Sequence, residues 1–260
     1  IPETKDIETG EWIRLETPTQ AEIHEVAEKL KLDESLLTDA LDPYEAPRFE
    51  VEDKIPYVYL RYPYTDNPPG TAPLLIVVTK DEILTVARGT PAFLERFVGG
   101  EIDFPTSQRT KLLILFMAEI TTRYTSAMTA IQRAVNRRKQ SVSDMDENDI
   151  VELASHESAV NTFLDALIPQ ANALTKLQLG KTLAVEEEDQ DLIDDVILST
   201  SQLIELGRSL LKSMENTREA YTAISTQRLN KIIRRLTILT VLITIPNVVT
   251  GFYGMNVLLP

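Results

Sequence analysis

The sequence predicts an α+β protein: an N-terminal α/β sandwich domain, a long antiparallel helical hairpin, and a very long stalk helix continuing into one transmembrane helix. Three observations support this fold class. Short β-rich and helical segments alternate up to about residue 105, and two long helical stretches without glycine follow. From about residue 187 to Tyr253 the chain has the character of a single helix, with Pro246 as its one proline.

The first part of the chain contains both strand-like and helix-like sequence patterns. The predicted strands are residues 11–15, 55–61, 74–79 and 82–88. The predicted helices of this part are residues 18–30, 34–41 and 91–99. We expect Thr17 to cap the first helix, with Pro18 at its first position, and Asp33 to cap the second. Its glycines are too scattered for a phosphate-binding loop.

The helical part divides at polar and glycine-containing breaks. The predicted arms of the hairpin are residues 108–140 and 149–179, joined by a polar turn at 141–148. A helix from about residue 187 to Tyr253 would be roughly 100 Å long at 1.5 Å per residue, so we expect it to pack against other helices as a stalk. The domain boundaries that we predict are 1–105 for the α/β domain, 106–185 for the hairpin, 186–235 for the stalk, and 236–260 for the first transmembrane helix with its following loop.

Composition and charge exclude several classes of function. The chain has no cysteine and two histidines, His24 and His156, so thiolate chemistry is excluded and a histidine-rich zinc site is not expected. The net charge is −14, but residues 220–260 carry +4 with no acid, which leaves −18 on the first 219 residues. An acidic body repels nucleic acid and attracts cations, so we expect no nucleic-acid partner.

The last 25 residues, 236–260, carry no charge and follow a basic cluster, as at the cytoplasmic edge of a membrane helix. Polar or small residues recur along this segment at intervals of 7, 3, 4, 3 and 4, which places them on one helical stripe. The stripe consists of Asn230, Thr237, Thr240, Thr244, Asn247 and Gly251. Such a stripe either lines a cation pore formed by several copies or joins neighbouring helices.

The four residues Tyr253-Gly254-Met255-Asn256, at the end of this charge-free helix, resemble the signature of the CorA family of divalent cation transporters. The residues before the helix, 223–226 and 229–230, support the resemblance. Looser similarity extends over the whole chain and includes residues 38–41, 48–50 and 57–59. The chain would then be a subunit cut off after its first transmembrane helix, with the second one lying beyond Pro260.

The resemblance implies a magnesium channel that is a homopentamer in the cell (inner) membrane, multi-pass when complete, with a cytoplasmic N-terminal domain and contact with membrane lipid. The residues Tyr253, Gly254, Met255 and Asn256 would form the selectivity loop. The pore would be lined by Asn230, Ile233, Leu236, Thr237, Thr240, Thr244, Asn247 and Gly251, of which Ile233 and Leu236 are candidate hydrophobic constrictions. Influx would be passive, driven by the membrane potential.

Members of the family also bind regulatory magnesium between cytoplasmic domains, and the matching residues here are Asp39 and Asp195. Asp195 closes a run with seven acids in ten residues, 186–195. Carboxylates at an interface repel each other, and a hard divalent cation relieves that repulsion. The alternative is a solvated helix start, where acids suit the helix dipole. The family usually has an acid where this chain has Thr38, which makes the metal site different here.

Three other functions compete with a magnesium channel. The same architecture serves transporters of Zn²⁺, Co²⁺ or Ni²⁺, although the absence of cysteine favours a hard ion such as Mg²⁺. A soluble coiled-coil scaffold explains residues 187–235 but not the charge-free end of the chain. An enzyme is not expected, because no nucleophile–base pair or ligand cluster is found in the sequence.

Overall fold

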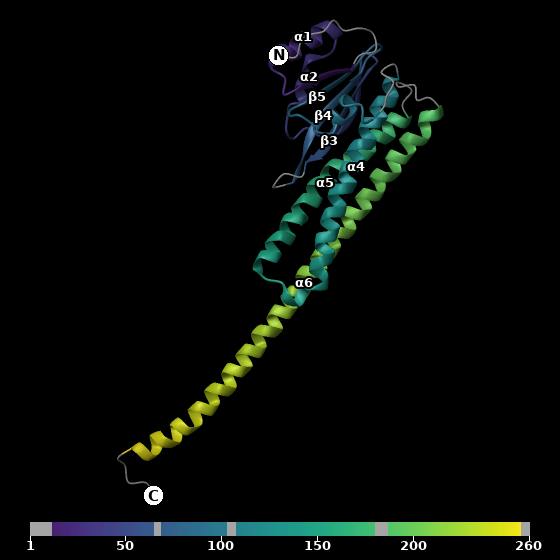
Figure 1. Ribbon diagram of the computed structural model, residues 1–260. Coiled ribbons are helices and arrows are strands. Elements are labelled where there is room, and N and C mark those ends of the chain that lie inside the picture. The colour runs from purple at the N-terminus through teal and green to yellow at the C-terminus, as the bar shows by residue number, and fades with distance from the viewer. Residues whose placement is uncertain (1–11, 65–68, 103–107, 180–186, 256–260) are drawn as a thin grey trace.

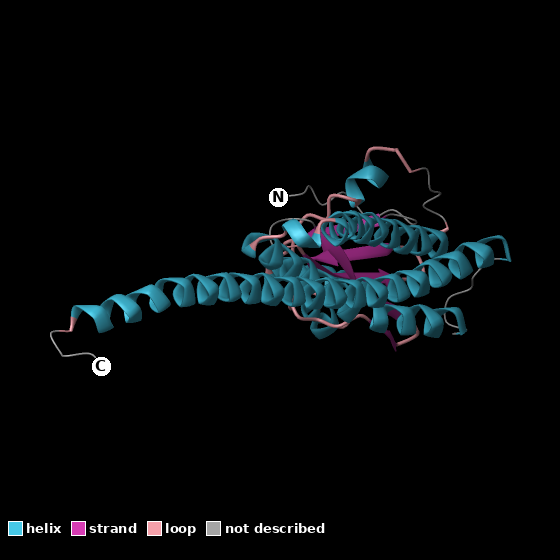
Figure 2. Cartoon of the chain, turned by 90° about the horizontal axis from the view of Figure 1, so that it is seen from below, coloured by secondary structure: helices cyan, strands magenta, loops and turns pink. Residues whose placement is uncertain are grey.

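The structure is a computed structural model that describes residues 12–64, 69–102, 108–179 and 187–255. A compact body of sheet and helices lies at one end of the molecule, and a single helix extends far beyond it toward the C-terminus (Figure 1). Seen from below, the sheet lies in the middle of the body with helices around it (Figure 2).

Five strands form one mixed sheet in the order β1-β5-β4-β3-β2. The strands are β1 (Trp12–Glu16), β2 (Arg48–Glu52), β3 (Ile55–Tyr64), β4 (Gly70–Val78) and β5 (Ile83–Ala87). The central strands pair antiparallel, and β1 pairs with β5 in parallel, with Trp12 opposite Ile83. All four predicted strands are present, and β2 is an edge strand that the residue pattern alone did not predict.

Alternate residues of the strands pack on opposite faces of the sheet, because side chains point to opposite sides with a period of two. On one face, Tyr57 and Tyr59 of β3 pack with α1 (Gln20–Leu30) and α2 (Glu34–Asp39). On the other face, Val58 and Leu60 join the core made with the long helices. The N-terminal part is therefore a three-layer α/β sandwich, as predicted.

The cap of α1 differs from the prediction. Thr19, not Thr17, is the N-cap, because Glu22 completes a capping box with it: the Thr19 amide donates to the Glu22 carboxylate at 2.7 Å. Thr17 instead has a positive φ of 52° and donates its backbone N–H to the carbonyl of Ala87 at 2.9 Å. Asp33 caps α2 as predicted, accepting from the amides of the next turn.

Two long helices form the hairpin: α4 (Arg109–Gln140) and α5 (Glu147–Leu179), with a short 3-10 turn, η1 (Val142–Asp144), at its tip. These bounds agree with the predicted arms to within two residues. The helix α3 (Leu94–Val98) is shorter than expected and precedes the hairpin. Pro169 lies inside α5, which continues through it.

The stalk is α6 (Glu187–Gly254), a single helix of 68 residues. Its upper half packs against both arms of the hairpin, and Ile193, Leu203 and Met214 are buried there. These residues belong to the same apolar cluster as Val58 of the sheet and Phe163 of α5. One core therefore joins sheet, hairpin and upper stalk, and the domain boundaries given above stay a prediction.

Candidate functional site

The lower half of α6 leaves the body and has no protein around it (Figure 1). Every residue from 226 to 255 is exposed in this chain, although most of the side chains beyond Arg235 are large and apolar. By length and composition α6 is a candidate membrane span, and its apolar window is not buried in the chain. An exposed apolar surface of this extent requires lipid or other protein to cover it.

Threonines of the polar stripe make hydrogen bonds within the helix. The hydroxyls of Thr237 and Thr240 donate to the carbonyls of Ile233 and Leu236, each at 2.9 Å, and Thr244 donates to Thr240 at 2.7 Å. Because each hydroxyl proton is used on the backbone, the lone pairs of the oxygen remain available as acceptors. The stripe therefore offers oxygen acceptors to whatever faces it.

The other predicted pore residues also lie along this half of α6. Asn230, Asn247 and Gly251 are exposed and share the stripe with the threonines. The helix continues through Pro246, and its end curves in Figure 1. The helix ends at Gly254, within the signature, and the amide of Met255 donates to the carbonyl of Phe252 at 3.4 Å. Asn256, for which we predict a selectivity role, lies outside the described residues.

A basic cluster on α6 lies between the body and the apolar segment. Its members are Arg228, Lys231, Arg234 and Arg235. Arg228 donates from Nη2 to the backbone carbonyl of Ser143 at the tip of the hairpin. Farther up, Arg218 of α6 pairs with Glu157 of α5 at 2.9 Å. The hairpin is thus tied to the stalk by ionic and polar contacts where α6 leaves the body.

Asp39, one of the two predicted metal ligands, has an arginine as its partner. It lies at the end of α2 and accepts from Nη2 of Arg48 at 2.9 Å. Arg48 also pairs with Glu45 and with Glu50, and its guanidinium stacks on Tyr59, 3.7 Å from the ring centre. Partial burial alone would lower the pKa of Arg48, but the hydrogen bonds from its guanidinium to Glu50 and Asp39 raise it.

This cluster of three carboxylates around one guanidinium is a feature that the sequence analysis missed. The residues lie within twelve positions of each other, yet only the turn between α2 and β2 brings them together. A cation arriving at Asp39 must compete with Arg48 for the carboxylate. The side chain of Asp39 is 45% exposed, so it is reachable from solvent.

Asp195, the second predicted ligand, is exposed on the upper part of α6. Within the described residues it shares no hydrogen bond or ion pair with Asp39. Nearby, Asp189 is buried and lies 3.4 Å from Nζ of Lys111 on α4, so part of the acidic run is structural. The residues that the structure describes contain no group of three or more carboxylate or histidine side chains placed to hold a metal within one chain.

Both histidines have carboxylate neighbours. Nδ1 of His24 lies 2.8 Å from Glu34, and this hydrogen bond raises the pKa of the exposed imidazole. His156 lies 3.5 Å from Glu152, one turn earlier on α5. The two imidazoles belong to different helices, α1 and α5.

Comparison with known proteins decides the family. The sequence matches the family of CorA-like Mg²⁺ transporter proteins over residues 8–260. The chain belongs to this family. It is 20% identical over 256 residues to the cobalt/magnesium transport protein CorA of Methanocaldococcus jannaschii, covering 94% of this chain and 79% of the relative. The resemblance seen at residues 253–256 is thereby confirmed.

Several solved structures have the same fold. The complete structure of the CorA magnesium transporter from Methanocaldococcus jannaschii superposes with a TM-score of 0.84 at 21% identity, covering 96% of this chain and 80% of that one. The full-length CmaX protein gives 0.77 at 18% identity, covering 95% and 77%. The ZntB cytoplasmic domain from Vibrio parahaemolyticus gives 0.68 at 11% identity, covering 83% and 88%.

Family membership fixes the broad function. Members of the CorA family are channels and transporters, so the chain is a CorA-family divalent cation transporter and not an enzyme. The predicted fold class, from sandwich domain to stalk and apolar span, is confirmed by the CorA structures. The roles of individual residues stay predictions.

Proposed function

We propose that the chain is a subunit of a homopentameric magnesium channel in the cell membrane, with the sandwich domain, hairpin and upper stalk in the cytoplasm. The stripe of oxygen acceptors on a charge-free, uncovered helix is the observation that carries the proposal. Five copies of α6 around an axis would turn Thr237, Thr240 and Thr244 into rings of hydroxyl oxygens. The apolar faces of the same helices would meet lipid and neighbouring helices.

The direction of transport follows from charge. An inside-negative potential favours the entry of a divalent cation by about 4.6 kcal/mol per 100 mV, twice the value for one charge, so influx needs no ATP. A cytoplasmic location of the preceding part of the chain is supported by the basic residues Arg228, Lys231, Arg234 and Arg235. The acidic body, at −18 for the first 219 residues, favours cations near the inner mouth.

Selection of the ion is assigned to residues 253–256 at the outer end of the helix. Magnesium gives up its waters reluctantly, so a ring of amide and carbonyl oxygens would hold the hydrated ion through its water shell. Asn256 would supply one amide per subunit. Nearer the cytoplasm, Ile233 and Leu236 would form apolar rings that close the pore by excluding water.

Closure by cytoplasmic magnesium is assigned to Asp39 and to Asp195 of the partner subunit. Both carboxylates are accessible, and oxygen ligands suit Mg²⁺. Arg48 neutralises Asp39 while no metal is bound, so metal binding would exchange one cation for another. The transported ion is Mg²⁺, with Co²⁺ as a second cargo, because the relative from Methanocaldococcus jannaschii is named for both ions. Absence of cysteine disfavours Zn²⁺.

The decisive experiment is magnesium uptake into vesicles that carry the intact protein, with Asn256→Ala against wild type. Loss of a hydrogen bond to a charged group costs about 1.5–3 kcal/mol, so we expect influx to fall at least about tenfold while the oligomer persists on native gels. Asn161→Ala, an exposed asparagine of α5, is the matched control and should conduct normally. Undiminished influx through the Asn256 variant would refute the selectivity role.

A further inference from the structure

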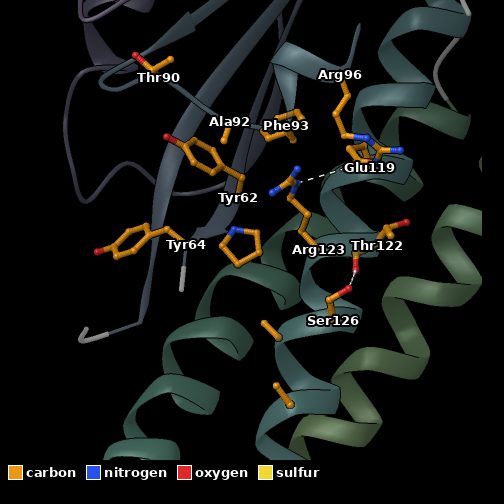
Figure 3. A pocket seen from close by; sticks show the side chains of 13 residues that line it. Tyr62, Tyr64, Thr90, Ala92, Phe93, Arg96, Glu119, Thr122, Arg123 and Ser126 are labelled. Carbon is orange, nitrogen blue, oxygen red and sulfur yellow. Dashed lines mark hydrogen bonds and ion pairs between the residues drawn. The ribbon is translucent and has the colours of Figure 1, made fainter. Parts of the chain in front are cut away.

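A cleft in the body is used by none of the roles above. It has a volume of about 670 Å³ and lies between the end of β3, the segment before α3, and one face of α4 (Figure 3). Glu119, Arg123, Ser126 and Ala130 contribute the wall on α4, at helical spacing of three or four. Sites for small organic ligands have volumes of about 300–1,000 Å³, so the cleft is large enough for one.

The charged side chains of the cleft leave one guanidinium partly free. Glu119 is nearly buried and accepts from Nη1 of Arg96 at 2.7 Å and from Nε of Arg123 at 3.3 Å. Arg96 has a second carboxylate, Glu101, outside the cleft at 3.0 Å. The terminal nitrogens of Arg123 donate to no other side chain or carbonyl among the described residues, and Figure 3 shows them reaching into the cleft near Tyr62.

Arg123 is also held in place by an aromatic ring. Its guanidinium lies 5.7 Å from the centre of Phe93, and Phe93 in turn meets Tyr62 edge-on with ring centres 5.7 Å apart. A guanidinium fixed by a carboxylate on one side and a ring on another loses little entropy when it binds an anion. The lining carries two arginines and one glutamate in a chain whose net charge is −14, so this cleft is a local exception to the acidic surface.

Hydroxyl groups and apolar surface complete the lining. Burial raises the pKa of Tyr62 to about 12, so its hydroxyl keeps its proton at neutral pH. Thr90, Thr122 and Ser126 add hydroxyls at the rim, and Ala127 adds apolar surface. An inorganic anion would leave most of this volume and apolar surface in contact with water, whereas an organic group would cover it.

We propose that this cleft binds a small organic phosphate of the nucleoside monophosphate class, with the phosphate on Arg123 and the planar base against the exposed ring of Tyr64. Guanidinium groups bind phosphate through paired, charge-assisted hydrogen bonds. Tyr64, at the end of β3, is exposed and offers ring surface for stacking, whereas Tyr62, two residues earlier on the same side of the sheet, is largely buried and packs edge-on against Phe93. The site is independent of the pore and of the magnesium ligands.

The test is equilibrium dialysis of the intact, detergent-solubilised protein against labelled AMP, in buffer without divalent cations so that chelation plays no part. We expect AMP to bind at least about tenfold more tightly than either adenosine or inorganic phosphate, since each of these lacks one half of the recognition. Equal affinity for inorganic phosphate and AMP would overturn the assignment of an organic ligand, and equal affinity for adenosine would overturn the role of Arg123. Absence of AMP binding at millimolar concentration would overturn the whole proposal.

Two variants locate the site. Arg123→Gln should weaken AMP binding at least about tenfold, and Ser126→Phe, which fills the cleft and leaves the ion pairs intact, should do the same. The matched control is Arg133→Gln, an exposed arginine ten residues along α4 and outside the cleft, which should bind AMP normally. Wild-type binding by Ser126→Phe would place the ligand elsewhere and refute the proposal even if Arg123→Gln failed to fold.

Discussion

Gly207 lies where the stalk comes closest to the hairpin, and enlarging it is a direct test of that packing. A Cβ atom at this position would lie 2.8 Å from Cδ2 of Leu164 on α5 and 3.1 Å from Cε of Met128 on α4. Both neighbours are buried, so they have little room to move away. Glycine therefore permits an approach of three helices that any larger residue would disturb.

Two opposing effects set the size of the change for Gly207→Ala. Alanine in place of glycine favours the helix by about 1 kcal/mol, while overpacking of a core costs about 1–3 kcal/mol. The net effect is a loss of roughly 1 kcal/mol, which for a chain of this size lowers the thermal midpoint by about 2–4 °C. Leu164→Ala should remove the shortest of these contacts and leave only the one to Met128, at 3.1 Å.

The sign of the effect in two backgrounds distinguishes close packing from helix propensity. In the wild-type background Gly207→Ala should lower the thermal midpoint of the solubilised protein, and in the Leu164→Ala background it should raise it. Ser209→Ala, at an exposed position two residues further along α6, should leave the midpoint almost unchanged. A rise with Gly207→Ala in both backgrounds would refute the close approach of stalk and hairpin.

Two further predictions concern charged groups. Arg48→Gln removes the guanidinium that pairs with Asp39. Magnesium should then protect the body from protease at a concentration roughly fivefold lower, which corresponds to about 1 kcal/mol for one exposed ion pair. If the variant needed a higher magnesium concentration, Arg48 would not compete with the metal for Asp39. His24 should titrate above 6.5 by NMR because its hydrogen bond to Glu34 raises its pKa, and Glu34→Gln should lower that midpoint. The pair of His24 and Glu34 therefore stabilises the fold below about pH 6.5, and this contribution is lost as pH rises through the raised pKa of His24. If Glu34→Gln left the titration midpoint of His24 unchanged, the contribution of the pair would be ruled out.

Much of the fold could be read from local sequence, because its elements are long and regular. The arms of the hairpin and the stalk have helical periodicity over thirty residues or more, and their bounds in the structure lie within two residues of the predicted ones. The short strands and helices were harder to predict from the sequence. β2 alternates Arg48, Glu50 and Glu52 with two apolar residues, as an exposed loop also can, and only pairing with β3 makes it a strand.

The site residues divide in the same way. The polar stripe of α6 could be predicted because it depends on spacing along one helix. The partner of Asp39 could not, because Arg48 meets it through the turn between α2 and β2. Glu119 and Arg123 lie one turn apart on α4, so their pairing is local, but the contact that brings Arg96 of α3 to the same glutamate depends on tertiary packing. The cap of α1 was assigned to the wrong threonine because Thr17 and Thr19 are two residues apart. The capping box between Glu22 and Thr19, seen in the structure, distinguishes them.

The unbroken course of α6 has a mechanical consequence. Below the contact between Arg228 and the tip of the hairpin, 26 residues remain to Gly254, a length of about 39 Å at 1.5 Å per residue. If the helix moves as a rigid rod, a tilt of about 5° at the contact with the hairpin displaces its far end by about 3 Å. A small rotation of the body therefore displaces the C-terminal end of the helix by a larger distance. Pro246, where one backbone hydrogen bond is missing, is the point at which the helix can bend.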